Sequence, residues 1–190
     1  MRGLFPSFFI LVDFLKNFCY NLVERSEKMN IEIWTDGACR GNGVAENAIS
    51  GIGIVLLIPD KEPIYAHERL YFKPNTNNKA EIYAIIQGIN LLYSNYKIKN
   101  EFGVDTVTIY SDSAYVINGI TNWIYGWRAN GWINSKKEPV KNKELWQELD
   151  NLLENLKLNF DVKFEKVKGH CGIKWNEKCD ELANKAMNER

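Results

Sequence analysis

Residues 31–43, IEIWTDGACRGNG, contain the stretch that decides the fold. Apolar and polar side chains alternate from Ile31 to Thr35, which predicts a half-buried β-strand, and a segment rich in Gly and Asn follows. We therefore expect Asp36 to leave the strand in a turn at the rim of a sheet. An Asp-Gly pair is also a common turn former, so Asp36 taken alone has a purely structural interpretation.

The apolar runs that follow predict an antiparallel meander. Ser50–Ile58 and Ile64–Phe72 have the composition of strands, and Pro59-Asp60 forms the expected hairpin turn between them. Ala80–Tyr93 then places isoleucines and leucines at helical spacing. This pattern predicts a helix whose buried face covers the three strands.

The second half of the chain predicts two more strands. Val104–Tyr110 is rich in β-branched residues, and a helix separates it from the third strand, so it can run parallel to the first strand and beside it. Leu145–Leu156 predicts an amphipathic helix, Phe160–Val167 a fifth strand, and the segment around Asp180 a final helix. The predicted fold class is therefore α/β, with a five-stranded mixed sheet of three antiparallel and then two parallel strands, flanked by helices.

Composition restricts the kinds of protein that this chain can be. A length of 190 residues suits one domain with a real core. Lys plus Arg and Asp plus Glu both total 24, so no global field attracts nucleic acid and any polyanion site must be local. The cysteines and histidines lack the spacing of a zinc site or a disulfide lattice, which favours a reducing compartment and a cytoplasmic location: Cys19, Cys39, Cys171, Cys179, His67 and His170.

Residues 1–28 differ in character from the rest, because they are apolar and aromatic with a few charges. The longest uncharged run, Gly3–Val12, is too short to span a bilayer, and no small-residue cleavage site follows it. We predict an accessory N-terminal extension over residues 1–28 and one catalytic-size domain over residues 29–190. The alternatives are a signal peptide or anchor, an amphipathic helix packed on the domain or on a membrane surface, and an upstream extension of a protein that begins naturally at Met29.

Four acids are expected to meet at one edge of this sheet. Glu81 and Asp112 lie near the starts of predicted helices, although Asn78 with Glu81 also fits a capping box and Asp112 also fits an N-cap. With Asp36 and Asp180 they would repel one another unless divalent cations bind. Oxygen ligands without a Cys or His cage predict Mg²⁺, with Mn²⁺ as a substitute. Two such ions about 3.5–4 Å apart support in-line phosphoryl displacement, so the predicted reaction is phosphodiester hydrolysis.

Residues 121–143, TNWIYGWRANGWINSKKEPVKNK, combine tryptophans with cations. Five cations and one acid give Arg128–Lys143 a local formal charge of five minus one, or +4. Aromatic faces and cations together grip a nucleic-acid backbone without reading its sequence. The alternative is that the tryptophans belong to the core and the lysines to a solvated rim.

In five motifs, by their order and spacing, the chain resembles type 1 ribonuclease H: TDGACRGNG, TNNKAEIYAI, YSDSAYVINGI, TNWIYGWRANGW and VKGHCGIKWNEKCDELANKA. The resemblance covers about residues 30–187. It implies the ribonuclease H-like fold and hydrolysis of the RNA strand of RNA/DNA hybrids, with products that end in 5′-phosphate and 3′-hydroxyl groups.

The resemblance also implies roles for individual residues. It makes the four carboxylates the metal ligands and gives His170 a part in water activation or product release, although a lone loop histidine is more often incidental. It places the amides of Asn42, Asn77 and Asn78 near the cleft, and Thr76 and Asn142 at a DNA-strand phosphate. It places Tyr115 and Trp123 beside the deoxyriboses, and Lys136 and Lys137 on a basic protrusion. We expect a monomer without an obligatory protein partner.

Two other functions fit parts of the pattern. A DNA nuclease or integrase-like enzyme of the same fold shares the acids, but the Trp-rich protrusion and the Asn77-Asn78 pair argue against it. A non-catalytic hybrid-binding module would not need the complete acid set.

Overall fold

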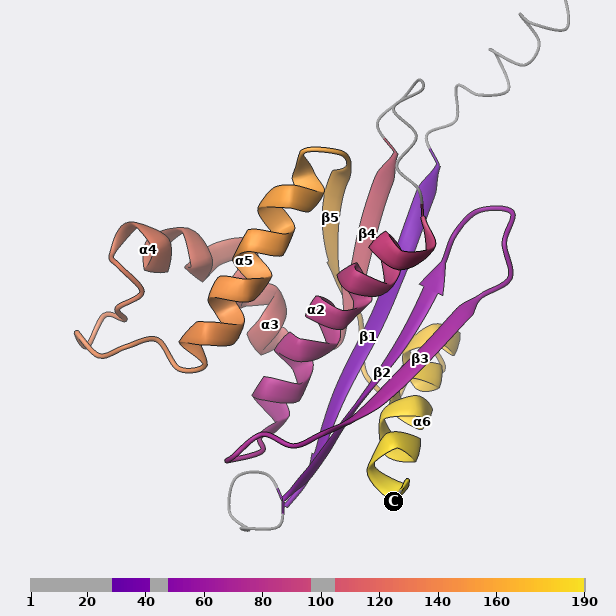
Figure 1. Ribbon diagram of the computed structural model, residues 1–190, viewed down its shortest axis with the longest axis horizontal. Coiled ribbons are helices and arrows are strands. Elements are labelled where there is room, and N and C mark those ends of the chain that lie inside the picture. Colours follow the sequence, from indigo (N-terminus) through magenta and orange to yellow (C-terminus); the bar gives the residue numbers. More distant parts are fainter. Residues whose placement is uncertain (1–28, 42–47, 97–104, 190) are drawn as a thin grey trace, which may run out of the picture.

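The structure is a computed structural model that describes residues 29–41, 48–96 and 105–189. One mixed sheet in the order β3-β2-β1-β4-β5 organises the fold (Figure 1). The first three strands are antiparallel, whereas β4 runs parallel to β1 and β5 parallel to β4. This confirms the predicted fold class. The strands are β1 (Asn30–Arg40), β2 (Ile49–Leu57), β3 (Ile64–Leu70), β4 (Thr106–Ser111) and β5 (Asp161–Lys166).

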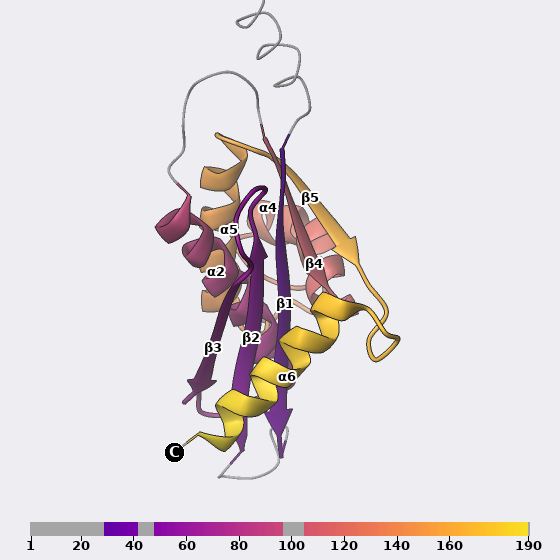
Figure 2. The same cartoon turned by 90° about the vertical axis from the view of Figure 1, so that its right-hand side faces the viewer.

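Helices cover both faces of the sheet. Helices α2 and α5 pack on one face, and α6 crosses the opposite face diagonally (Figure 2). A string of short helices leads from the end of β4 away from the sheet to α5 (Figure 1). The helices are α2 (Asn77–Asn95), α3 (Ala114–Asn118), the π-helical turn η1 (Gly119–Trp123), α4 (Ile124–Ala129), α5 (Lys143–Lys157) and α6 (Lys174–Asn188).

The main core lies between the sheet and α2 with α5. Ile31 and Ile33 of β1 face it, as the alternation predicts, and the isoleucines of α2 fill the opposite wall. Trp146 of α5 is fully buried there. Burying a large aromatic side chain stabilises the fold by several kcal/mol, so α5 ties the short helices to the sheet.

Helix α6 packs unusually close to β2 because the strand offers glycines. A Cβ atom on Gly53 would lie 2.0 Å from the carbonyl oxygen of Cys179, and one on Gly51 would lie 2.4 Å from that of Ala183. Any larger side chain would push the helix away from the sheet. The two glycines therefore set the distance between the sheet and α6, the helix that carries Asp180.

Some predicted boundaries are wrong by several residues. Strand β1 continues to Arg40 instead of ending at Thr35, and β3 ends at Leu70 instead of Phe72. The predicted turn at Pro59-Asp60 is confirmed, with Asp60 at a positive φ of 61°. Val104, the predicted start of the fourth strand, and the extension over residues 1–28 lie outside the described residues. In the described part of the chain no helix is both long and apolar enough to cross a membrane.

Candidate active site

Asp36 lies inside β1, which corrects the expectation of a turn. Its backbone pairs with Gly53 of β2, whereas β4 pairs with β1 only as far as Trp34. Asp36 therefore projects beyond the carboxyl end of β4, and its side chain is 8% exposed. A Cβ atom on the next residue, Gly37, would lie 2.4 Å from the backbone of Glu81, so glycine is needed for α2 to approach this strand.

Glu81 reaches the same place from the second turn of α2. The predicted capping box of Asn78 and Glu81 is wrong, because α2 begins earlier and the hydroxyl of Thr76 accepts a hydrogen bond from the Lys79 N–H. Glu81 is 5% exposed, and within the described part of the chain its Oε2 atom has no hydrogen-bond partner. Burial, followed by the charges of Asp36 and Asp112, raises the pKa of Glu81 well above its ordinary value.

Asp112 follows the last residue of β4. Its alternative role as an N-cap is wrong, since the Ser113 hydroxyl accepts the hydrogen bond from the Val116 N–H instead. The Asp112 carboxylate accepts a hydrogen bond of 3.2 Å from the side-chain amide of Asn176 on α6. A Cβ atom on Gly169 would lie 2.5 Å from Asp112 Oδ2, so the loop before α6 also closes on this acid.

The first three acids form one cluster. Asp36, Glu81 and Asp112 each offer a carboxylate oxygen, and these atoms lie within 4.8 Å of one another. Burial, followed by the charges of Asp112 and Asp180, raises the pKa of Asp36 to about 7, although the Gly37 backbone hydrogen bond and the charge of His170 act in the opposite direction. An unpaired buried oxygen beside two more carboxylates is what a divalent cation would satisfy. The donor set therefore fits a hard metal ion.

Asp180 and His170 lie beside this cluster. Both act electrostatically on Asp36, Asp180 as a negative charge and His170 as a positive one. The Asp180 carboxylate accepts a hydrogen bond of 2.9 Å from the amide of Asn184, and Asp180 is not part of the three-residue cluster. His170 is exposed on the loop between β5 and α6 at a positive φ of 52°.

Sequence reasoning missed the two amides of α6. Asn176 stands one helical turn before Asp180 and Asn184 one turn after it, so the three residues share a face of α6. Asn176 is only 3% exposed, which is unusual for a polar side chain. The i, i+4, i+8 spacing was visible in the sequence, but the contact with Asp112 was not.

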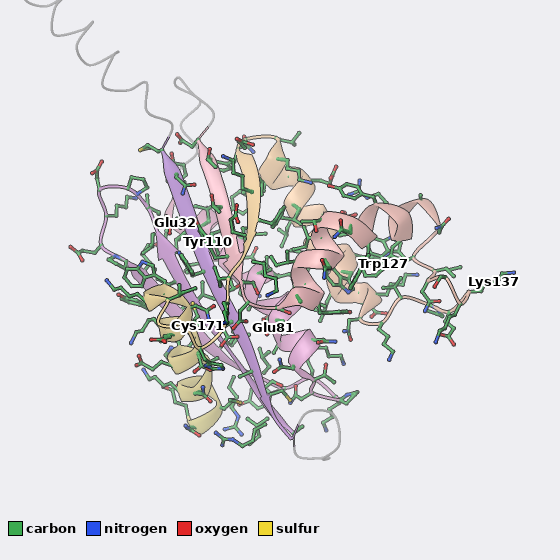
Figure 3. All side chains as sticks on the ribbon, turned by 180° about the vertical axis from the view of Figure 1, so that it is seen from behind. Glu32, Glu81, Tyr110, Trp127, Lys137 and Cys171 are labelled. Atoms are coloured by element: carbon green, nitrogen blue, oxygen red, sulfur yellow. The ribbon has the colours of Figure 1, made fainter. Side chains whose placement is uncertain are left out.

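The predicted protrusion, residues 123–143, includes α4 and the loop that leads to α5, and it projects away from the sheet (Figure 1). Figure 3 labels Trp127 and Lys137 on it, well separated from Glu81. Trp123 is 39% exposed, so it is not a core residue, whereas the half-buried Trp127 and Trp132 pack against the main core. The ring centroid of Trp123 lies 6.0 Å from that of Tyr115 and 5.7 Å from that of Trp127.

Arg128 is not a free member of the basic segment. Its guanidinium donates to Asp150 and to Glu154 of α5, the latter at 3.1 Å. Its charge is therefore neutralised by the body of the domain. Lys136 and Lys137 are exposed on the outer loop of the protrusion.

The remaining predicted substrate contacts that the structure describes lie at helix starts. Thr76, Asn77 and Asn78 stand at the N-terminus of α2, on the helix that carries Glu81. Asn142 precedes α5 with a left-handed φ of 59°. Asn42 lies outside the described residues. Their substrate roles stay predictions.

Comparisons with known proteins show the family to which this chain belongs. The family model for RNase H matches residues 28–188. Ribonuclease H of Clostridium botulinum is 45% identical over 159 residues, which is 83% of this chain and 95% of that protein. Ribonuclease H of Francisella philomiragia is 43% identical over 166 residues, which is 86% of this chain and 95% of that protein.

Solved structures share the fold at low sequence identity. LC9-RNase H1, described as a type 1 RNase H with the type 2 active-site motif, matches with a TM-score of 0.66 at 22% identity, covering 84% of this chain and 72% of that chain. LC11-RNase H1, solved in complex with an RNA/DNA hybrid, matches with a TM-score of 0.59 at 22% identity over 83% of this chain and 96% of that chain.

The five-stranded mixed sheet and the carboxylates clustered beyond the end of β4 are the fold and the acid set that the resemblance implied. The chain belongs to the RNase H family, which confirms the resemblance stated above. It is therefore a ribonuclease H, an enzyme that hydrolyses the RNA strand of RNA/DNA hybrids.

Proposed function

We propose that this ribonuclease H acts by two-metal-ion catalysis with Mg²⁺, for which Mn²⁺ can substitute, and that it leaves 5′-phosphate and 3′-hydroxyl ends. The observation that carries the proposal is the cluster of Asp36, Glu81 and Asp112, with carboxylate oxygens within 4.8 Å of one another. Together with Asp180 they would hold the ions. When bound, Mg²⁺ supplies positive charge that activates a water and stabilises the leaving oxygen.

The protein's own groups prepare this site before any ion binds. The pKa values of Asp36 and Glu81 are raised because burial and the neighbouring carboxylates disfavour the charged forms. A bound cation would stabilise those charged forms and thereby the folded site. Asn176 donates to Asp112 Oδ2 and thereby orients that carboxylate. His170, exposed on its loop and close enough to influence Asp36, would move a proton at the reacting water or help product leave.

Substrate binding would use neutral contacts near the cleft and charge farther away. The amides of Asn42, Asn77 and Asn78 would contact the hybrid beside the acids. Thr76 and Asn142 would hold a DNA-strand phosphate, Tyr115 and Trp123 would lie along the deoxyriboses, and Lys136 with Lys137 would attract the backbone. RNA shows its 2′-hydroxyls across a wide minor groove, and DNA tolerates deformation, so requiring both strands rejects either pure duplex.

We also propose a division of the chain into an accessory extension over residues 1–28 and a catalytic domain over residues 29–190, which acts as a monomer. The family match over residues 28–188 supports this division. The free thiols of Cys39, Cys171 and Cys179 support the proposed cytoplasmic location, since reducing compartments keep thiols unpaired.

A cleavage assay tests the proposed chemistry. The full chain is incubated with four substrates: hybrid, RNA duplex, DNA duplex, and DNA duplex with one embedded ribonucleotide. Each is run with Mg²⁺, with Mn²⁺ and with a chelator, and the product ends are identified by phosphatase and ligase treatment. We expect Mg²⁺-dependent cleavage of the hybrid with ligatable 5′-phosphates. Cleavage in the presence of chelator, or products with 3′-phosphates, would rule out the two-metal proposal.

A further inference from the structure

A groove of about 630 Å³ opens on the protrusion between α4 and residues 133–137. It is several times larger than a nucleobase and within the size range of small-ligand sites. Two indole rings, three amide side chains and one cation contribute to its lining: Trp123, Trp127, Asn122, Asn130, Asn134 and Lys137.

The walls of the groove are aromatic and held in place. The rings of Trp123 and Trp127 are tilted by 51°, with centroids 5.7 Å apart. Trp127 is supported from behind by the fully buried Trp146, whose ring centroid lies 5.3 Å away. On α4, a Cβ atom on Gly126 would meet nothing within 4 Å, so the groove is open at this residue. A flat ligand therefore finds a fixed stacking surface and free space beside it.

The charge of the groove argues against a duplex backbone as its ligand. Among the lining residues Lys137 is the one cation. Arg128 belongs to α4, the helix on one side of the groove, but it is already paired with Asp150 and Glu154.

Two of the three amides already have partners within the protein, since Asn134 Oδ1 accepts from the Lys136 and Glu138 N–H groups and the Asn122 amide donates to Asn118. The indole faces are therefore the main surface that the groove offers to an unpaired base. Aromatic faces and a single cation are a set suited to one or two unpaired nucleotides.

We propose that this groove binds an unpaired nucleotide of the DNA strand at the point where that strand leaves the hybrid. The inference rests on the proposed function, in which Tyr115 and Trp123 lie along the DNA strand. The Trp123 ring lies between Tyr115, at 6.0 Å, and Trp127, at 5.7 Å, so the groove continues from the proposed DNA contacts. A single-stranded DNA overhang would enter it and stack on the indoles.

Binding measurements without metal test the groove separately from cleavage. Fluorescence anisotropy gives Kd for hybrids of one sequence that are blunt, or that carry a DNA overhang of four nucleotides at the 3′ or the 5′ end. A fourth hybrid carries an abasic overhang with the same phosphates at the preferred end. We expect one overhang to tighten binding about five- to 150-fold, as one stacked base does, and the abasic overhang to give less than about a threefold gain.

A groove-filling variant with a matched control completes the test. Gly126→Met places a side chain in the open space, and a helical methionine is better tolerated than glycine. It should abolish the advantage of the overhang, whereas Ala129→Met, on the same helix outside the groove lining, should keep it. Wild type with no overhang advantage, an equal gain from the abasic overhang, or a full advantage in Gly126→Met would each overturn the proposal. Mg²⁺-dependent cleavage of the blunt hybrid is scored separately and reports on the proposed function alone.

Discussion

The acid cluster consists of buried charged groups, whereas the protrusion exposes apolar side chains to solvent. Asp36 and Glu81 are 8% and 5% exposed and are held where their charges repel, whereas Trp123 and Ile133 on the protrusion are 39% and 44% exposed. The cluster is destabilising until a cation binds, and its geometry is imposed by the sheet, α2 and α6. The protrusion presents apolar surface to solvent and is fastened by Arg128 and by Trp127. Metal binding and substrate binding therefore depend on separate regions, which can be altered independently.

The largest effect is expected from the cluster. Asp36→Asn and Asp112→Asn should each reduce Mg²⁺-dependent cleavage of a hybrid at least about a thousandfold, because an amide keeps the shape but loses the charge that holds the metal. Hybrid affinity, measured without metal, should stay within about threefold of wild type. Activity within tenfold of wild type at saturating Mg²⁺ would remove that residue from the metal ligands.

The pH dependence of stability should separate the cluster from the rest of the molecule. The pKa of Asp36 is about 7 in the folded chain and near 3.8 unfolded, so the folded state holds this proton more tightly. In metal-free buffer its contribution to the free energy of unfolding is therefore full below about pH 4 and is lost as pH rises to about 7.

The same shift sets the expected size of that loss. It corresponds to at most about 4 kcal/mol. Asp36→Asn should therefore gain stability over wild type progressively between pH 4 and 7, as denaturant titrations would measure. Saturating Mg²⁺ should stabilise wild type much more than the variant. A stability difference that is independent of pH would contradict this account.

His170→Ala should slow turnover by about ten- to a thousandfold, since a single acid-base group contributes about 10² to 10⁴ and this exposed residue assists from beside the cluster. The metal requirement and the hybrid Kd should barely change. Single-turnover kinetics with hybrid and Mg²⁺ give the rate, and anisotropy gives the affinity. If affinity falls as far as the rate, the histidine is a substrate contact.

The smallest effect is expected on the protrusion. Trp123→Ala should weaken hybrid binding by roughly 1 to 3 kcal/mol through lost stacking. Because Trp123 is exposed, Tm should fall by no more than a few degrees, unlike the loss expected for the buried Trp146. Measuring Kd and Tm on both Trp123→Ala and Trp127→Ala sharpens the contrast, since the half-buried Trp127 should show the larger loss of Tm.

Local pattern predicted most of the fold. The alternation in β1 and the isoleucine spacing of α2 follow directly from burial on one face, which depends on nearby residues. The position of Asp36 inside a strand did not follow from it, because an Asp-Gly pair is turn-like by local criteria. Here tertiary packing decides, since Gly37 makes room for the backbone of α2.

The parts of the site that escaped prediction depend on long-range contacts. Arg128 was counted as free charge, but its partner Asp150 stands 22 residues later on another helix. Asn176 contacts Asp112 across 64 residues of sequence. The capping error at Glu81 was smaller, since Thr76 and Asn78 are both reasonable caps and only the actual first turn distinguishes them.

The glycines of β2 restrict how this chain can vary. Gly51 and Gly53 contact no reacting group, yet the α6 backbone lies so close that even one methyl group would have to displace it. Moving α6 would move Asp180 and Asn176 with it, because both belong to that helix. Alanine at either position should thus lower the rate of cleavage by displacing α6, although neither glycine lies among the acids. In a library of random variants, these two positions should tolerate as few substitutions as the acids themselves. The reason is the short distance between β2 and α6, not charge.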